Sequence, residues 1–213
     1  KDVYWGMMLG IAESLRYGIV SAADMYNFCE DMAQALVETG MKGNIGRHIV
    51  AFGDENLADL DCFKEAKAFR AACHGAGEGR VLADLSLHAE YTSTPKVVRQ
   101  LAEYAVSEGA RMQVHVSETK DEVEGCRQRH GKTPPRYLYD LGLFDVPATA
   151  AHCVHLEEED RALLAEKGVT VASCPISNLK LASGVCDASA LLRHGINLSL
   201  GTDSVASNNS LDF

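Results

Sequence analysis

The 213-residue sequence predicts an α/β fold of the (β/α)8 barrel type, and three observations support this prediction. Short β-branched runs alternate with helical stretches along the whole chain. Gly40, Gly109, Gly168 and Gly195 each follow a helical stretch and precede the next strand, where glycine adopts the left-handed conformation without steric cost. Polar residues collect where the apolar runs stop. Repeated helix–glycine–strand units of this kind are typical of parallel sheets.

Seven segments are expected to form strands, at residues 19–24, 44–52, 81–88, 112–116, 149–152, 169–173 and 196–201. Helices are expected between them, at residues 25–39, 59–72, 95–107, 119–130, 157–166 and 188–193. The opening residues 3–11 have the pattern of the middle of a buried helix, and the glycine-rich residues 75–79 are expected to form a loop. A closed barrel needs eight strands. We therefore expect residues 1–213 to form one partial barrel domain, strands two to eight, of a chain that begins upstream.

Composition excludes several classes of protein. The net charge of −10 argues against nucleic acid as a partner, because binding to phosphates requires a basic surface. No apolar run approaches the roughly 18 residues of a transmembrane helix. The seven cysteines are odd in number and include no Cys-x-x-Cys pair, which argues against disulfides or a structural zinc cluster. These features favour a cytoplasmic protein that acts on a small molecule, and they are compatible with a homo-oligomer.

Four polar residues lie at the ends of four predicted strands: His88, His115, His152 and Asp203. In a (β/α)8 barrel the carboxyl ends of the strands share one face, which carries the active site. Residues far apart in sequence can therefore converge there, whereas an open sheet would spread them along a line. Each of the four has a structural interpretation when taken alone, as a hydrogen-bonded core histidine or a turn aspartate. Their shared position favours a catalytic one.

The chemistry of these residues points to a metal-dependent hydrolase. A neutral His115 imidazole suits zinc or iron, and Asp203 can bind the same metal and accept a proton from the attacking water. Glu118, three residues after His115, is placed to act as a general acid and base. His152 is either a ligand or a group that holds the nucleophilic hydroxide, and His88 is placed to contact the substrate.

His115 and Asp203 are only two ligands, whereas catalytic zinc usually has about three protein ligands and an open position. The ligand set and the strand count are each incomplete, so we expect the missing first strand, upstream of Lys1, to carry the remaining ligands.

Four segments resemble the amidohydrolase superfamily: residues 115–119, 151–156, 175–184 and 201–212. Within it, the sequence is most similar to the group that contains methylthioadenosine/S-adenosylhomocysteine deaminases and triazine hydrolases. Softer matches extend the resemblance over nearly the whole chain.

The resemblance implies a TIM (β/α)8 barrel of the metal-dependent hydrolase type with a flanking small β domain, which, like the first strand, is missing from this chain. It implies one divalent metal ion, zinc with iron as the alternative, bound by a His-x-His pair on the first strand together with His115 and Asp203. Glu118 matches the proton shuttle, and His152 matches the histidine that positions the hydroxide. His88 and Arg47 match substrate-binding residues, and Glu118 also contacts the substrate.

The sequence departs from the family pattern in three places. No His-x-His occurs, Ser173-Cys174 replaces the usual residues before the Pro-x-Ser-Asn run, and Ala89-Glu90 stands where Ala-Pro is more common. The last two departures are expected near the rim of the substrate pocket.

The resulting hypothesis is hydrolytic deamination of an aminated purine nucleoside of the methylthioadenosine type. One alternative is amino- or chlorohydrolysis of a triazine, or of guanine, at the same site. A second is a non-catalytic barrel that only binds a ligand.

Overall fold

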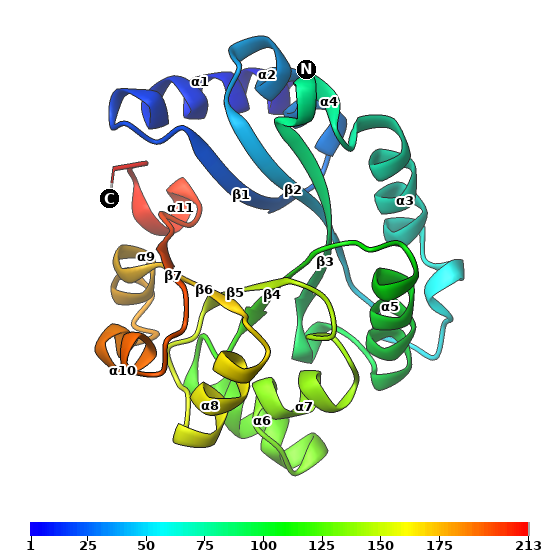
Figure 1. Cartoon of the computed structure of the whole chain (residues 1–213), viewed down its shortest axis with the longest axis vertical. Helices are drawn as coiled ribbons and strands as arrows, with labels where there is room; N and C mark the ends of the chain where they lie inside the picture. Colours follow the sequence, from blue (N-terminus) through cyan, green and yellow to red (C-terminus); the bar gives the residue numbers. More distant parts are fainter. Residues whose placement is uncertain (213) are drawn as a thin grey trace.

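The computed structural model describes residues 1–212, in which one parallel sheet curls so that helices cover its outer side (Figure 1). The elements follow in the order α1 (Asp2–Arg16), β1 (Ser21–Tyr26), α2 (Cys29–Thr39), β2 (Lys42–Ile49), η1 (Leu57–Asp59), α3 (Asp61–Cys73), α4 (Ala76–Gly79), β3 (Val81–Ala89), η2 (Glu90–Thr92), α5 (Pro95–Ser107), β4 (Met112–Val116), α6 (Lys120–His130), α7 (Pro134–Asp140), β5 (Ala148–His152), α8 (Glu158–Glu166), β6 (Thr170–Ser173), α9 (Pro175–Lys180), α10 (Ala188–Arg193), β7 (Leu198–Leu200) and α11 (Val205–Asn208).

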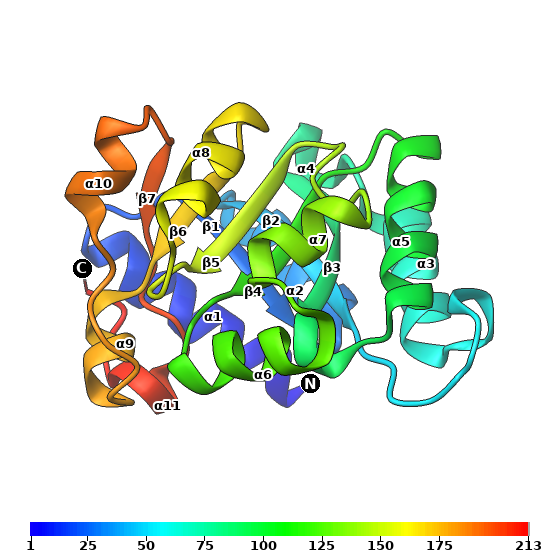
Figure 2. The same cartoon turned by 90° about the horizontal axis from the view of Figure 1, so that it is seen from below.

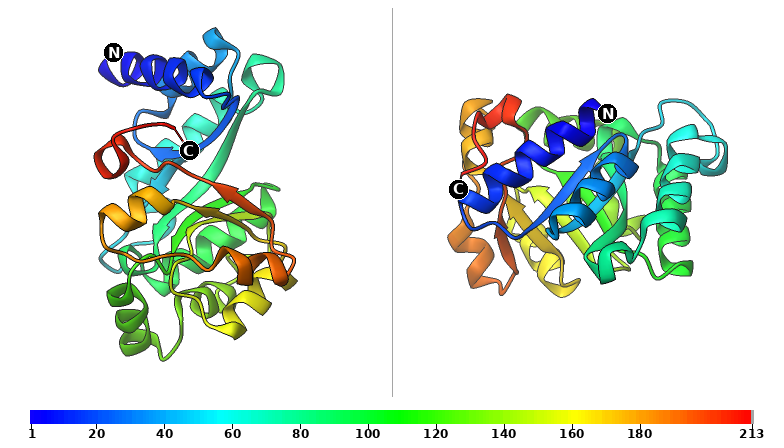
Figure 3. Two further views of the ribbon diagram at one scale, coloured as in Figure 1. Left: turned by 90° about the vertical axis from the view of Figure 1, so that its left-hand side faces the viewer. Right: turned by 90° about the horizontal axis from the view of Figure 1, so that it is seen from above.

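The seven strands lie in chain order, β1-β2-β3-β4-β5-β6-β7, and every neighbouring pair is parallel. The predicted fold class and all seven predicted strands are therefore confirmed. The curl brings the two edges of the sheet toward each other (Figures 1 and 3). There the backbone N–H of Leu211 donates to the Glu13 carboxylate of α1, with 3.1 Å between N and O.

The first βα boundary differs from the prediction. The helix expected from residue 25 begins at Cys29, because Met25 and Tyr26 continue β1 and pair with Gly46 and Arg47 of β2. Phe28, with a left-handed φ of 56°, then separates strand from helix. The apolar Met25-Tyr26 pair fits either pattern, and the parallel pairing decides between them.

Helix α1 is confirmed as a helix, but its predicted burial is wrong. Within it only Ile11 and Ser14 are buried, while 59% of Trp5 and 71% of Leu9 are exposed. The helix packs against α2, and the segment around Leu211 also contacts it, while Trp5 and Leu9 lie toward solvent. Like the other described helices, α1 is not both long and apolar enough to cross a membrane.

The segment at residues 75–79, expected as a loop, contains the four-residue element α4. Gly77 within it has a left-handed φ of 62°, so the segment is a tight turn rather than a regular helix.

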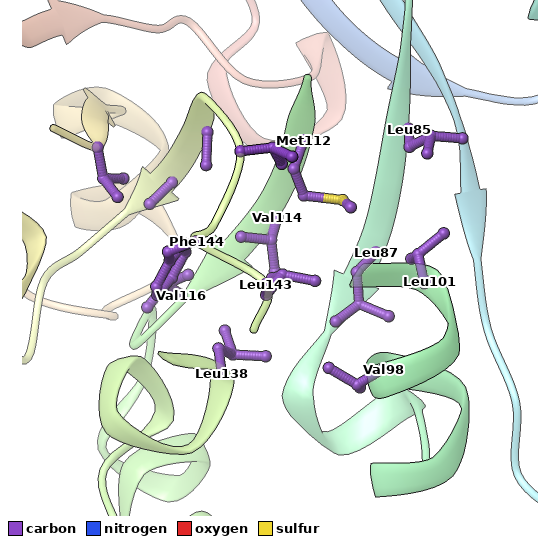
Figure 4. Packing of buried hydrophobic residues seen from close by; sticks show 14 of the residues in the cluster. Leu85, Leu87, Val98, Leu101, Met112, Val114, Val116, Leu138, Leu143 and Phe144 are labelled. Atoms are coloured by element: carbon purple, nitrogen blue, oxygen red, sulfur yellow. The ribbon is translucent and has the colours of Figure 1, made fainter. Parts of the chain in front are cut away.

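The main core lies between the sheet and the outer helices (Figure 4). Leu85 and Leu87 of β3 point to the same side, as alternate strand residues must, and belong to one buried cluster with Val98 and Leu101 of α5. All four side chains are fully buried. This packing fixes which residues of each strand point outward to the helices, and hence which point into the barrel.

The barrel interior is polar. The Gln113 side-chain amide donates to the backbone O of Asn44 at 3.1 Å and to the Asp84 carboxylate at 3.0 Å, which ties β4 to β2 and β3. Close approach of β2 and β3 depends on Gly46, because a Cβ at this position would lie 1.7 Å from Ser86 Oγ. The strands that carry the predicted site residues are therefore linked through the interior as well as through the sheet.

Candidate active site

Three of the predicted site histidines lie side by side at the carboxyl ends of β3, β4 and β5, whose arrangement is visible in Figure 2. The ring centroids of His88 and His115 are 5.1 Å apart, and those of His115 and His152 are 5.4 Å apart. Parallel pairing explains the proximity, because His115 aligns with Ala89 and His152 with Val116.

His115 is held as a neutral ring with one free nitrogen. Its Nδ1 donates to the backbone O of His88 at 2.7 Å, so Nε2 carries the lone pair. Burial, and then the neighbouring His152, lower the pKa of His115 to about 4. A neutral imidazole whose other nitrogen donates to a carbonyl is the form that binds metal ions in proteins.

Asp203 is held as a carboxylate. Its Oδ2 accepts hydrogen bonds from Ser177 Oγ at 2.5 Å and from Ser207 Oγ at 3.0 Å, and its Oδ1 accepts from the Ser204 backbone N–H at 2.8 Å. Burial alone would raise the pKa of Asp203, but these hydrogen bonds outweigh it and the pKa is lowered. The residue is therefore ionised at neutral pH.

Glu118 and His152 form a pair suited to proton transfer. His152 is 2% exposed, and its Nδ1 donates to Asn178 Oδ1 at 2.9 Å, which leaves Nε2 without a bond to Asn178. That nitrogen lies 3.6 Å from Glu118 Oε2. A carboxylate oxygen and an imidazole nitrogen at this separation can share a proton or contact a common proton donor.

Left-handed backbone conformations cluster at these strand ends. Ser117, His152, Cys153 and Asp203 have φ values of 51°, 72°, 50° and 58°. Positive φ is uncommon for residues other than glycine, and such strain concentrates at functional sites. At His152 it has a visible effect. Ala148 and Ala150 of the same strand pack outward in the main core, whereas the His152 ring stacks on His115 inside the barrel.

His88 lies beside His115, and its Nδ1 is 3.0 Å from Thr92 Oγ1. Arg47 is not brought to the histidines in this structure. Its Nε lies 2.7 Å from Glu65 Oε2 of α3, on the outer side of β2, and its Nη1 donates to the backbone O of His48 at 2.8 Å. In this conformation Arg47 belongs to the contact between β2 and α3.

The two residues expected at the pocket rim are buried. Glu90 is 1% exposed, and its carboxylate accepts from Arg129 at 2.6 and 3.1 Å and lies 3.0 Å from His130 Nε2. These contacts fix η2 to α6. Cys174 is 6% exposed, and a Cβ at Gly201 would lie 2.7 Å from its Sγ. Both side chains therefore point inward rather than to solvent, because the short segments after β3 and β6 turn them inward.

Ser177, Asn178 and Glu122 are site residues that the sequence did not single out. Ser177 and Asn178 lie on α9 and hold Asp203 and His152. Glu122 accepts from the backbone N–H groups of Ser117 and Glu118, both at 2.7 Å. Residues 175–184 resemble the family and include Ser177 and Asn178. The roles of these two residues depend on their contacts with Asp203 and His152, which come from other strands.

The donor chemistry present fits part of a site for a divalent metal. A neutral imidazole nitrogen on His115 and an ionised carboxylate on Asp203 suit a metal of the zinc type. Within residues 1–212, no three histidine, cysteine, aspartate or glutamate side chains converge closely enough to hold an ion. Within the described residues, His115 and Asp203 are thus two candidate donors rather than a full ligand set.

A parallel α/β barrel that gathers histidines and carboxylates at the carboxyl ends of its strands defines a class, the metal-dependent hydrolases of the barrel type. The chain belongs to the amidohydrolase family, whose model matches residues 1–213.

Individual relatives agree with this assignment. A 5-methylthioadenosine/S-adenosylhomocysteine deaminase of Pelotomaculum thermopropionicum is 42% identical over 213 residues, which are 100% of this chain and 48% of that protein. The structure of an adenosine deaminase from Xanthomonas campestris with bound zinc superposes with a TM-score of 0.89 and 33% identity, over 99% of this chain and 48% of that one.

A zinc complex of an atrazine chlorohydrolase from Arthrobacter aurescens has a TM-score of 0.86 at 21% identity, over 97% of this chain and 50% of that one, and shares the fold. The chain spans about half the length of the relatives it matches.

Proposed function

We propose that the protein catalyses hydrolytic deamination of an aminated purine nucleoside such as 5′-methylthioadenosine or S-adenosylhomocysteine. The observation that carries the proposal is the Glu118–His152 pair beside His115, a proton-transfer pair next to a metal-binding imidazole. The names of the relatives support the choice of substrate class. We also propose that residues 1–213 supply strands two to eight of an eight-stranded barrel, which the length of the relatives supports.

In this proposal His115 and Asp203 hold one divalent metal ion, with zinc favoured because the adenosine deaminase relative was solved with zinc. When bound, the metal supplies the Lewis acidity that lets water act as a nucleophile near neutral pH. Overall, the carbon–nitrogen bond to the amino group breaks, a carbon–oxygen bond to water forms, and ammonia leaves.

The residues of the chain divide the proton transfers among them. Asp203 and His152 orient the attacking oxygen, and Asp203 accepts a proton from it. Glu118 takes up one proton of the attacking water and delivers it to the ring nitrogen next to the reacting carbon. The other water proton, accepted by Asp203, passes through Glu118 to the amino group, which leaves as ammonia. His88 contacts the substrate. Arg47 can contribute only if it leaves Glu65, so we propose it as a substrate-binding residue solely in an alternative side-chain conformation.

The test is ammonia release by the full-length protein with a panel of substrates. We expect turnover of methylthioadenosine, S-adenosylhomocysteine or adenosine and no turnover of guanine or atrazine. Turnover of guanine or a triazine instead would overturn the substrate class while keeping the hydrolase. A metal-loaded protein that binds a nucleoside without turnover would support the non-catalytic alternative.

A further inference from the structure

His48 extends the row of histidines by one ring. The ring centroids of His48 and His88 are 5.8 Å apart, and His88 lies next to His115 and then His152. The four rings come from the consecutive strands β2, β3, β4 and β5. His48 had no predicted chemical role, because its position in the middle of an expected strand gave no sign of proximity to the others.

The alternation of β2 establishes that the His48 side chain points into the barrel. Ile45 and Ile49 are buried in the clusters between sheet and helices, and Arg47 pairs with Glu65 of α3. His48 therefore projects from the opposite face of the strand. Its edge-to-face contact with the His88 ring agrees with this direction.

His48 is the one ring of the four whose nitrogens have no hydrogen-bond partner among the described residues; the other three bond to Thr92, the His88 carbonyl and Asn178. Burial, and then the adjacent Arg47, lower the pKa of His48, so the ring is neutral at pH 7. A neutral imidazole offers one donor and one acceptor. A half-buried ring with both unused is suited to a polar ligand.

We propose that His48 is a specificity-determining residue that hydrogen-bonds the sugar hydroxyl groups of the nucleoside. This inference rests on the proposed function. The reacting carbon must lie near His115 and Asp203, and His88 follows as the next ring. His48 lies one ring farther along the row, where the sugar of a purine nucleoside would extend.

The experiment uses the full-length protein and compares His48→Phe with wild type. Phenylalanine keeps a ring against His88 and removes both nitrogens. The substrates are adenosine, 2′-deoxyadenosine and 3′-deoxyadenosine. We expect His48→Phe to raise KM for adenosine by about three- to tenfold, the loss of one or two neutral hydrogen bonds, with kcat nearly unchanged. In this variant the KM for adenosine should no longer be lower than the KM for 2′-deoxyadenosine or 3′-deoxyadenosine.

Two further variants sharpen the comparison. His48→Asn retains a donor and an acceptor and should keep part of the preference for adenosine. His194→Phe is the matched control, because this ring precedes β7 at the opposite end of the barrel and bonds to Glu158, so its kinetics should match wild type.

Failure of this inference is distinguishable from failure of the proposed function. If wild type deaminates adenosine but His48→Phe keeps the wild-type KM and the preference for the ribose, His48 has no such role. If wild type releases no ammonia, calorimetric titration with adenosine and 2′- and 3′-deoxyadenosine decides. Preferential binding of adenosine that His48→Phe abolishes supports the inference, and equal binding by both proteins, or none, overturns it.

Discussion

At the scale of single residues, each candidate catalytic group is fixed by a neighbour with one specific chemical role. The His88 carbonyl sets the tautomer of His115, Asn178 sets that of His152, and Ser177 keeps Asp203 ionised. Because these partners are themselves held on rigid elements, the reactive atoms need little rearrangement when a substrate arrives. Such preorganisation is what an electrostatically assisted proton transfer requires.

Glu118 permits the most direct test of the chemistry. Glu118→Gln keeps the size of the side chain but removes its ability to gain and lose a proton, so kcat for deamination should fall by about 100- to 10,000-fold. Metal content, measured by elemental analysis of the full-length protein, should stay at the wild-type level, because Glu118 is not a proposed ligand. Glu124→Gln on the exposed side of α6 is the control and should retain full activity. Wild-type turnover by Glu118→Gln would refute the role assigned to this residue.

At the scale of elements, the start of α6 positions the turn after β4. The N-cap Thr119 accepts from the Glu122 N–H at 3.1 Å, while the Glu122 carboxylate accepts from Ser117 and Glu118. The arrangement is related to a capping box, except that the Glu122 carboxylate accepts from the two residues before the N-cap rather than from the N-cap itself. It stabilises the left-handed Ser117 and thereby fixes the path of the chain between His115 and Glu118.

Removing the Glu122 carboxylate should therefore affect both stability and catalysis. Glu122→Ala leaves two backbone N–H groups without acceptors, which should lower the free energy of unfolding by about 1–3 kcal/mol. The same variant should lower kcat more than it raises KM, because the displaced turn carries Glu118.

Urea unfolding and steady-state kinetics measure the two effects. Glu124→Ala, two residues along the same helix and exposed, should change stability by less than about 0.5 kcal/mol. Equal effects of the two substitutions would show that the cap has no special role.

The sequence predicts elements well where periodicity is long and poorly where tertiary contacts decide. Residues 95–107 were predicted with the bounds that α5 has, and the short α10 was predicted because Gly195 marks the end of a helical stretch before the next strand. Helices α7, α9 and α11, with seven, six and four residues, were not predicted, because segments so short show little periodicity.

The same distinction holds for the site. The strand-end positions of His88, His115 and His152 follow from local patterns, and the parallel sheet brings these rings together. The local sequence around Arg47 does not indicate which face of β2 carries its side chain. In the structure the side chain lies on the outer face, against Glu65. His48 was overlooked for the corresponding reason, because it lies on the face that points into the barrel.

At the scale of the whole molecule, one buried cluster joins strands β2 to β6 to the outer helices. A cavity at any point in it should therefore weaken the entire barrel. Leu101 of α5 is fully buried in this cluster, so Leu101→Ala should lower the free energy of unfolding by about 2–5 kcal/mol.

Val106 of the same helix is 55% exposed and provides the matched control. Val106→Ala should change stability by less than about 0.5 kcal/mol, measured with Leu101→Ala by urea unfolding of the full-length protein. A loss below about 1 kcal/mol for Leu101→Ala would mean that the surroundings collapse into the space and that the core is more plastic than its packing indicates.

The strict chain order of the strands has a consequence for biosynthesis. Strands pair with their neighbours in sequence, so the residues of the site emerge from the ribosome in the order in which they line the barrel mouth, from His48 to Asp203. At roughly 5–20 residues per second, His115 is made several seconds before Asp203. It is also made before Ser177, whose hydroxyl donates to the Asp203 carboxylate. A nascent chain therefore exposes its histidines before Asp203 is made. If His115 and Asp203 bind a metal as proposed, productive metal loading has to await the end of β7.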